Sequence, residues 1–169
     1  MKYLKIFENF NSDEKIHEIC KKHNIENYTI NKDHSIDVDD DVNLYRKGLT
    51  KIPLKFRKVS GYFDCDDNSL TSLEGSPTSV GGDFYCDNNK LTSLEGSPTS
   101  VGGYFYCNDN PVNEVYNLFN DKDKIELLND YDIFRKVDGK PGIILDRLNS
   151  FLEDIGKESV TKVEGYINI

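Results

Sequence analysis

The stretch VGGDFYCDNNKLTSLEGSPTS, residues 80–100, decides the fold, because a near copy precedes it and the start of another, VGGYFYCNDN, follows it. Equivalent residues recur every 21 positions. They are Val59, Val80 and Val101; Phe63, Phe84 and Phe105; Cys65, Cys86 and Cys107; and Asn68, Asn89 and Asn110. A fixed period of roughly 20–50 residues predicts units that stack, because one unit alone cannot bury its apolar residues.

A less regular copy comes before these. The apolar positions of the period are filled there by Val38, Val42, Leu44, Leu49 and Ile52. We call each copy a rung and predict four of them: 38–58, 59–79, 80–100, and an incomplete one that begins at 101 and ends after Val115.

Within a rung the pattern reads V-x-x-x-F-x-C-x-x-N-x-L-x-x-L, followed by a Gly-Ser-Pro turn. Phe and Cys alternate with polar residues, which predicts a short strand with both on its inner face. Stacked in parallel, the rungs would place the cysteines in one interior column, where each acts as a small hydrophobe rather than a disulfide or zinc ligand. The Asn is expected to bind backbone groups at the turn that leaves the strand.

This pattern resembles the leucine-rich repeat, L-x-x-L-x-L-x-x-N-x-L, with aromatic and Cys residues in two of the Leu positions. The resemblance covers about residues 38–115, and Lys47 departs from it where Asn is expected. In detail the chain is most similar to short repeat proteins encoded by phages and their bacterial hosts. The resemblance implies the α/β class: a right-handed leucine-rich-repeat-like solenoid of about four rungs, with one parallel sheet and a mostly irregular outer coil. It supplies no catalytic residues.

The flanking segments are expected to cap the ends of the stack, which would otherwise expose strand edges. Residues 1–37 form the predicted N-terminal cap: a helix over 13–23, begun by Ser12 and ended by a left-handed Asn24, then a hairpin over 28–38. Residues 116–169 form the predicted C-terminal helical cap. Its last helix is expected over 141–156, beginning at Pro141, and residues 163–169 are expected to form a strand whose partner the sequence does not identify.

The formal net charge of −9 disfavours nucleic acid and anionic membranes as partners, because binding to phosphate depends on Lys and Arg. No apolar run approaches the ~18 residues of a membrane span. The predicted location is therefore the cytoplasm, which is the host cytoplasm if the chain is phage-encoded.

Two clusters of possible metal ligands occur in the sequence, but the spacing of each departs from that of a metal site. His17, Cys20 and His23 recur every three residues on the predicted first helix, but Cys20 also belongs to its packing stripe. In DVDDDVN, residues 37–43, a calcium loop would need Gly at its sixth position and Glu at its twelfth, where Val42 and Gly48 stand. We predict no enzyme activity, no cofactor and no metal, and keep a metal or thiol protein built on the first helix as a rival.

The residues beside Phe and Cys must face outward, because side chains alternate along a strand. The predicted partner-binding residues are Tyr45, Tyr62, Asp64, Asp66, Asp83, Tyr85, Asp87, Tyr104, Tyr106 and Asn108. Asp41 and Asn43 belong to the same face. One interpretation is simple cross-strand pairing of Tyr with solvating Asp.

The interpretation we favour is a recognition surface for a protein with a basic patch, because Tyr gives rigid contact area and Asp selects Arg or Lys. If the similarity to phage proteins holds, the partner is a host protein, and the chain inhibits a host process such as defence. The alternative is a structural or assembly component. The oligomeric state does not follow from the sequence.

Overall fold

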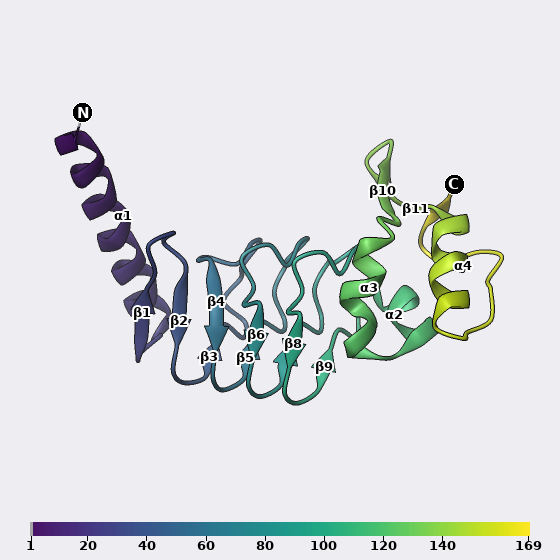
Figure 1. Cartoon of the computed structure of the whole chain (residues 1–169), viewed down its shortest axis with the longest axis horizontal. Coiled ribbons are helices and arrows are strands. Elements are labelled where there is room, and N and C mark those ends of the chain that lie inside the picture. The colour runs from purple at the N-terminus through teal and green to yellow at the C-terminus, as the bar shows by residue number, and fades with distance from the viewer. Residues whose placement is uncertain (1) are drawn as a thin grey trace.

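The computed structural model describes the backbone of residues 2–169 and the side chains of residues 12–169. The fold is mixed α/β, with parallel sheets in the middle of the chain and four α-helices among the described residues. Figure 1 shows a row of short strands, flanked at one end by a helix and hairpin and at the other by a helical group.

The first helix is longer than predicted. Helix α1 covers Lys2–His23, so Ser12 lies inside it and does not cap its start. The prediction was wrong because Leu, Lys and Glu are good helix formers and carry the helix upstream of Ser12. The end is as expected: Asn24 is left-handed with φ 55°, and the N–H of Ile25 bonds the carbonyl of Cys20 at 2.9 Å.

The predicted hairpin is present as β1 (Tyr28–Ile30) and β2 (Ile36–Val38), paired antiparallel. Strand β2 also pairs in parallel with β4 (Phe56–Val59). The hairpin therefore continues directly into the parallel strands that follow.

The rungs contribute strands to two sheets, where we expected one, and in both sheets the strands of successive rungs pair in parallel. The five-stranded sheet has the order β1-β2-β4-β6-β8, with β6 at Ser79–Val80 and β8 at Ser100–Val101. The four-stranded sheet has the order β3-β5-β7-β9, which are Val42–Asn43, Phe63–Asp64, Phe84–Tyr85 and Phe105–Tyr106. Within the four-stranded sheet, paired residues are 21 apart, as in Phe63↔Phe84.

The bend between the two strands of a rung explains the second sheet. The strand predicted around Phe84 is present, but Val80 lies in a strand of its own, and Gly81 and Gly82 separate the two. A Cβ at Gly81 would stand 2.1 Å from the carbonyl oxygen of Ser60. The glycine pair therefore lets successive rungs approach closely while the chain turns from one sheet to the other.

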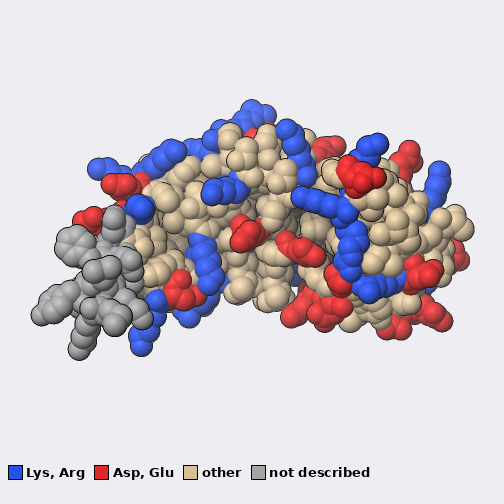
Figure 2. Space-filling model, turned by 90° about the horizontal axis from the view of Figure 1, so that it is seen from above, with Lys and Arg blue, Asp and Glu red and all other residues tan. Residues whose placement is uncertain are grey.

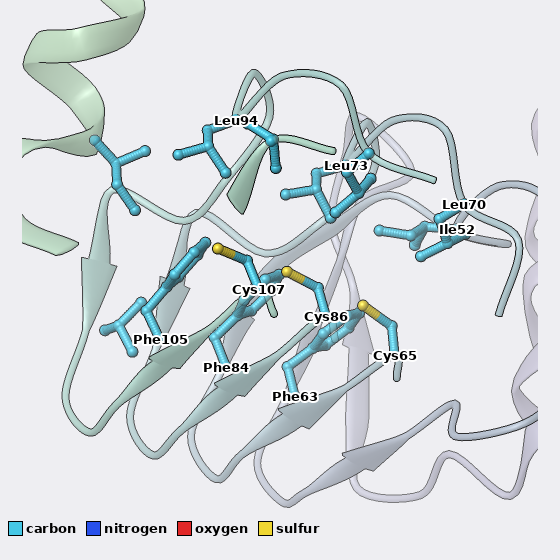
Figure 3. Close-up of a cluster of buried hydrophobic side chains, with 14 of the residues drawn as sticks. Ile52, Phe63, Cys65, Leu70, Leu73, Phe84, Cys86, Leu94, Phe105 and Cys107 are labelled. Carbon is cyan, nitrogen blue, oxygen red and sulfur yellow. The ribbon is translucent and has the colours of Figure 1, made fainter. Parts of the chain in front are cut away.

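The core lies between the sheets and the leucine-bearing coil, as Figure 3 shows. Phe84 stacks between Phe63 and Phe105 at centroid distances of 5.6 and 5.3 Å. The side chain of Asn89 donates to three backbone carbonyls, including those of Cys65 and Cys86, and accepts from the N–H of Leu70. These residues occupy the interior positions that the period predicts.

The C-terminal segment contains α2 (Asn113–Phe119), the 3-10 turn η1 (Lys122–Lys124) and α3 (Ile125–Asp130). A hairpin of β10 (Phe134–Val137) and β11 (Lys140–Ile143) precedes α4 (Leu145–Asp154). Pro141 therefore lies in a strand, and the predicted helix start there was wrong. The hairpin turns at Asp138-Gly139, both with positive φ, so the Asp-Gly pair was the missed sequence signal. The predicted last strand is β12 (Ile167–Asn168), and its partner is β11.

No helix in the described part of the chain is long and apolar enough to cross a membrane. Figure 2 shows Lys and Arg side chains interspersed with Asp and Glu over the face seen there.

Candidate protein-binding face

The predicted binding residues occupy the outer face of the four-stranded sheet. Phe84 and Cys86 are fully buried on the inner side, whereas the intervening Tyr85 is half-buried on the outer side. At 21-residue spacing the outer residues form three columns. They are Asp41, Tyr62, Asp83 and Tyr104; Asn43, Asp64, Tyr85 and Tyr106; and Tyr45, Asp66, Asp87 and Asn108.

Four of the five predicted tyrosines form one continuous row of rings. Tyr85 stacks on Tyr106 at 5.0 Å, with the ring planes 5° apart. Tyr62 meets Tyr85 edge-on at 6.4 Å, and Tyr104 meets Tyr106 at 5.9 Å. Tyr104 is 69% exposed. We call Tyr62, Tyr85, Tyr106 and Tyr104 the tyrosine row.

Tyr45 contacts other residues. The guanidinium of Arg46 lies 4.8 Å from the centre of its ring. Arg46 also pairs with Asp67, with 2.9 Å between Nε and Oδ2. Tyr45 is therefore a separate, exposed aromatic position on the same face, outside the continuous row of rings.

The outer carboxylates serve as backbone acceptors, which sequence reasoning missed. Asp83 accepts the N–H of Tyr104 and the hydroxyl of Tyr85, each at 2.7 Å. Asp87 accepts the N–H of Asn108 at 2.6 Å. A Cβ at Gly103 would lie 1.9 Å from the Asp83 carboxylate, so the repeated Gly-Gly pair was a sequence signal for this bond.

Three of the carboxylates form an acidic cluster: Asp64, Asp66 and Asp87. Burial, reinforced by the charges of its acidic neighbours, raises the pKa of Asp66 to about 7. Burial also raises the pKa of Asp64, again with a contribution from Asp87. A carboxylate that is partly buried beside other acidic groups is stabilised in its ionised form when a cation approaches it.

Comparison with known proteins adds no relative: no family model, curated protein or solved structure matches the chain. The function must therefore be argued from the chain's own geometry.

The interior cysteines are free thiols without reactive character. Cys65, Cys86 and Cys107 are buried, and burial raises the pKa of each, to about 12 for Cys107. The thiols of Cys65 and Cys86 each donate to a carbonyl of the next rung at 3.2 Å. A thiol that stays protonated is a poor nucleophile and a poor metal ligand.

The rival metal site on the first helix is not assembled. Within the described residues, no group of three His, Cys, Asp or Glu is placed to hold a metal ion. His17 bonds the hydroxyl of Tyr28 through Nδ1, whereas Cys20 is fully buried and His23 nearly so.

The acidic run at 37–43 is also dispersed. Asp37 pairs with Arg57, Asp40 accepts from the Asn27 amide, and Asp41 accepts the backbone N–H of Tyr62. Each of these three carboxylates is thus bonded to a different part of the chain, and no group of metal ligands is assembled in the described residues.

Proposed function

We propose that the chain is a non-enzymatic protein-interaction module that binds a partner protein through the outer face of the four-stranded sheet. The observation that carries the proposal is the continuous tyrosine row beside the acidic cluster. Tyr rings give rigid amphipathic contact area at little entropic cost. The ionised form of the acidic cluster is stabilised when an Arg or Lys side chain approaches. A partner with a basic patch therefore suits this face.

We further propose that residues 38–115 form a leucine-rich-repeat-like solenoid. The 21-residue offset between paired residues supports this, as does the recurring Asn that bonds the carbonyls of two rungs. Proteins of that kind generally bind through the face of their parallel sheet. The fold proposal and the binding proposal therefore favour the same surface.

The similarity to repeat proteins of phages and their bacterial hosts extends the proposal. The partner is then a host protein in the host cytoplasm, and binding inhibits a host process such as defence. This extension rests on resemblance and not on the geometry of the site.

The size of the face limits what it does alone. Four strands at about 4.8 Å spacing span roughly 15 Å. A stable interface buries around 800 Å² on each partner. Neighbouring surface must therefore contribute. The C-terminal side is the favoured source, because the most exposed ring of the row, Tyr104, belongs to the last rung.

The test is affinity capture from a lysate of the host, followed by mass spectrometry. The key variant is Tyr104→Ala with Tyr106→Ala, because Tyr104 is highly exposed and its loss should leave the fold intact. A matched control is Thr50→Ala with Thr71→Ala, two exposed residues on the coil. We expect the tyrosine variant to lose a protein that wild type and control both capture.

Full retention of that protein by the tyrosine variant would remove the sheet face from the interface. Capture by wild type should also weaken with added salt, because the acidic cluster contributes through charge. Self-association of the purified chain, seen by sedimentation across a concentration series, would favour the assembly alternative instead.

A further inference from the structure

The four-stranded sheet has a consistent hydrogen-bond polarity. Each strand donates N–H groups to carbonyls of the strand that follows it: Phe84 N donates to Tyr104 O at 2.8 Å. Two residues later, Cys86 N donates to Tyr106 O at 2.9 Å. The preceding pair of strands repeats both bonds, from Phe63 and Cys65.

With this polarity, the last strand of the sheet presents backbone N–H donors at its outer edge. Strand β9 ends the sheet, and no strand of the described chain pairs with its outer edge. The N–H groups of Phe105 and Cys107 stand at the positions that donate forward in the preceding strands. An open strand edge of this kind is a template for another strand.

The edge of the last strand of the five-stranded sheet, β8, is closed by a side chain. In the interior of that sheet, the carbonyl of Val80 accepts the N–H of Gly102. At its edge, the carbonyl of Val101 accepts the Nζ of Lys122 from η1 in place of a further backbone donor. One sheet edge is thus closed by a side chain of the C-terminal segment, whereas no described side chain bonds the N–H groups of Phe105 and Cys107 at the other.

A groove runs beside the open edge. It has a volume of about 520 Å³ and lies between β9 with its neighbours and the segment from α2 to η1. Tyr116 of α2 forms part of it and covers the inner side of Phe105, with 5.5 Å between ring centres. Asp121 and Asp123 line it on the η1 side. This volume suits a short chain segment and is too small for a folded domain.

The side-chain ladders of the outer face also stop at β9. Tyr85 stacks on Tyr106, and Asp87 accepts the backbone N–H of Asn108. The next strand would present a ring to Tyr106 and a backbone N–H to the amide oxygen of Asn108. Both the Tyr106 ring and the Asn108 amide are available to such a strand, because these two residues line the groove.

We propose that the edge of β9 binds an extended segment of a partner protein, which adds to the four-stranded sheet as a fifth parallel strand. The segment carries an aromatic residue that stacks on Tyr106, flanked by small residues because Tyr116 already covers the inner side of Phe105. It is basic, because two carboxylates of the groove, Asp121 and Asp123, outnumber its one cation, Lys122. The Nζ of Lys122 donates to the Val101 carbonyl and lies 3.8 Å from the Asp123 carboxylate. Main-chain bonds to an edge strand are a recurring mode of peptide recognition.

A second copy of this chain fits the edge less well. The chain carries a net charge of −9, so two copies repel. The opposite edge strand, β3, is also blunted: Asp41 N bonds the Asp40 side chain, and Tyr45 N bonds the Asn43 side chain. The segment from α2 to η1, which forms the other side of the groove, would also obstruct a second folded sheet. A single extended basic segment carries the opposite charge and is narrow enough to enter the groove.

The test uses a labelled peptide, acetyl-Gly-Lys-Ser-Tyr-Ser-Lys-Gly-amide, titrated into the ¹⁵N-labelled full chain and followed by NMR. Parallel pairing would join the peptide Tyr N–H to the Phe105 carbonyl and the peptide Tyr carbonyl to the Cys107 N–H. We expect the amide signals of Phe105 and Cys107 to shift and to exchange more slowly with solvent. The same peptide with N-methyl-Tyr should bind at least about tenfold more weakly, because it loses one of these bonds and clashes with the strand.

Two exposed positions on α2 give a matched pair of variants. Asn117 lines the groove and Glu114 does not. Asn117→Trp should fill the groove and abolish peptide binding, whereas Glu114→Trp should leave it unchanged. Equal binding of the two peptides, no effect of Asn117→Trp, or no binding to wild type would each overturn the proposal. Concentration-dependent self-association that Asn117→Trp abolishes would assign the edge to a second copy instead.

This inference does not depend on the proposed function of the outer face. Tyr62 belongs to the tyrosine row and lies outside the groove. Tyr62→Ala should therefore leave peptide binding unchanged, even where it weakens capture of a folded partner. Loss of peptide binding in Tyr62→Ala would contradict the edge assignment alone.

Discussion

The inner and outer faces of the same short strands are stabilised by different forces, although their residues alternate one by one. On the inner face, Phe84 and Cys86 are fully buried in stacked columns. On the outer face, Tyr85 and Asp87 are only half-buried and are held by hydrogen bonds and ring contacts. The inner face therefore depends on packing volume and the outer face on polar geometry, and only the outer side chains remain partly exposed at the surface.

The largest test of this difference removes an inner ring. Phe84→Ala should lower the free energy of unfolding by about 3–5 kcal/mol, because it leaves a cavity between two stacked phenylalanines. Tyr104→Ala on the outer face should change it by less than about 0.5 kcal/mol. Urea unfolding of both variants measures the contrast. Similar losses would mean that the faces are not energetically distinct.

The next test concerns the polar ladder at the end of the strands. Asn89→Ala should cost about 2–3 kcal/mol, because it leaves buried carbonyls and the N–H of Leu70 without their partner. Asn108→Ala removes a similar amide from the exposed face and should cost less than about 1 kcal/mol. Thermal unfolding of the pair would show whether burial or amide chemistry sets the cost.

A smaller loss is expected for Cys86→Ser, about 1–2 kcal/mol. The serine hydroxyl can still donate to the Tyr106 carbonyl, as the thiol does, but its burial is costlier. Peptide and partner binding should be unchanged, because Cys86 lies on the inner face. A stable Cys86→Ser protein that no longer binds its partner would contradict the structural role assigned to the thiol.

The smallest effect is a pH dependence on the outer face. The pKa of Asp66 is raised to about 7 from its ordinary 3.8. Its stabilising contribution is therefore complete below about pH 4 and is lost as the pH rises through 7. Asp66→Asn should match wild type near pH 4 and exceed it near pH 8 by on the order of 1 kcal/mol, allowing for partial exposure. Melting curves across this range measure the difference, and a constant offset would argue against the shift.

The inner face could be predicted from the sequence and the outer face only in part. The period placed Phe63, Cys65 and Leu70 in the interior, because a column of identical apolar residues has one way to avoid water. It also identified which residues face outward. The apolar period alone did not indicate that Asp83 accepts a backbone N–H, because the signal for that bond is the glycine at 103, which lets the next rung approach closely.

The ends of the chain were harder because no period constrains them. Pro141 suggested a helix start, yet the Asp-Gly turn before it makes a hairpin whose pairing with β12 spans more than twenty residues. The helix start at Ser12 failed for a related reason: a good cap residue does not end a helix when its neighbours favour continuing it. Single residues, Pro141 and Ser12, decided these two predictions. The structure follows instead from the Asp-Gly turn, the pairing with β12 and the helix propensity of the residues before Ser12.

The matching of Phe63, Phe84 and Phe105 across paired strands has an evolutionary consequence. Each unit presents the same residues to both of its neighbours, so duplication of one 63-nucleotide segment of the gene would insert a strand pair without new contacts having to evolve. Such a duplication would lengthen the outer face by about 4.8 Å and leave both ends of the molecule unchanged. The length of the outer face is thus a trait that duplication alone can adjust, whereas point mutation adjusts its chemistry.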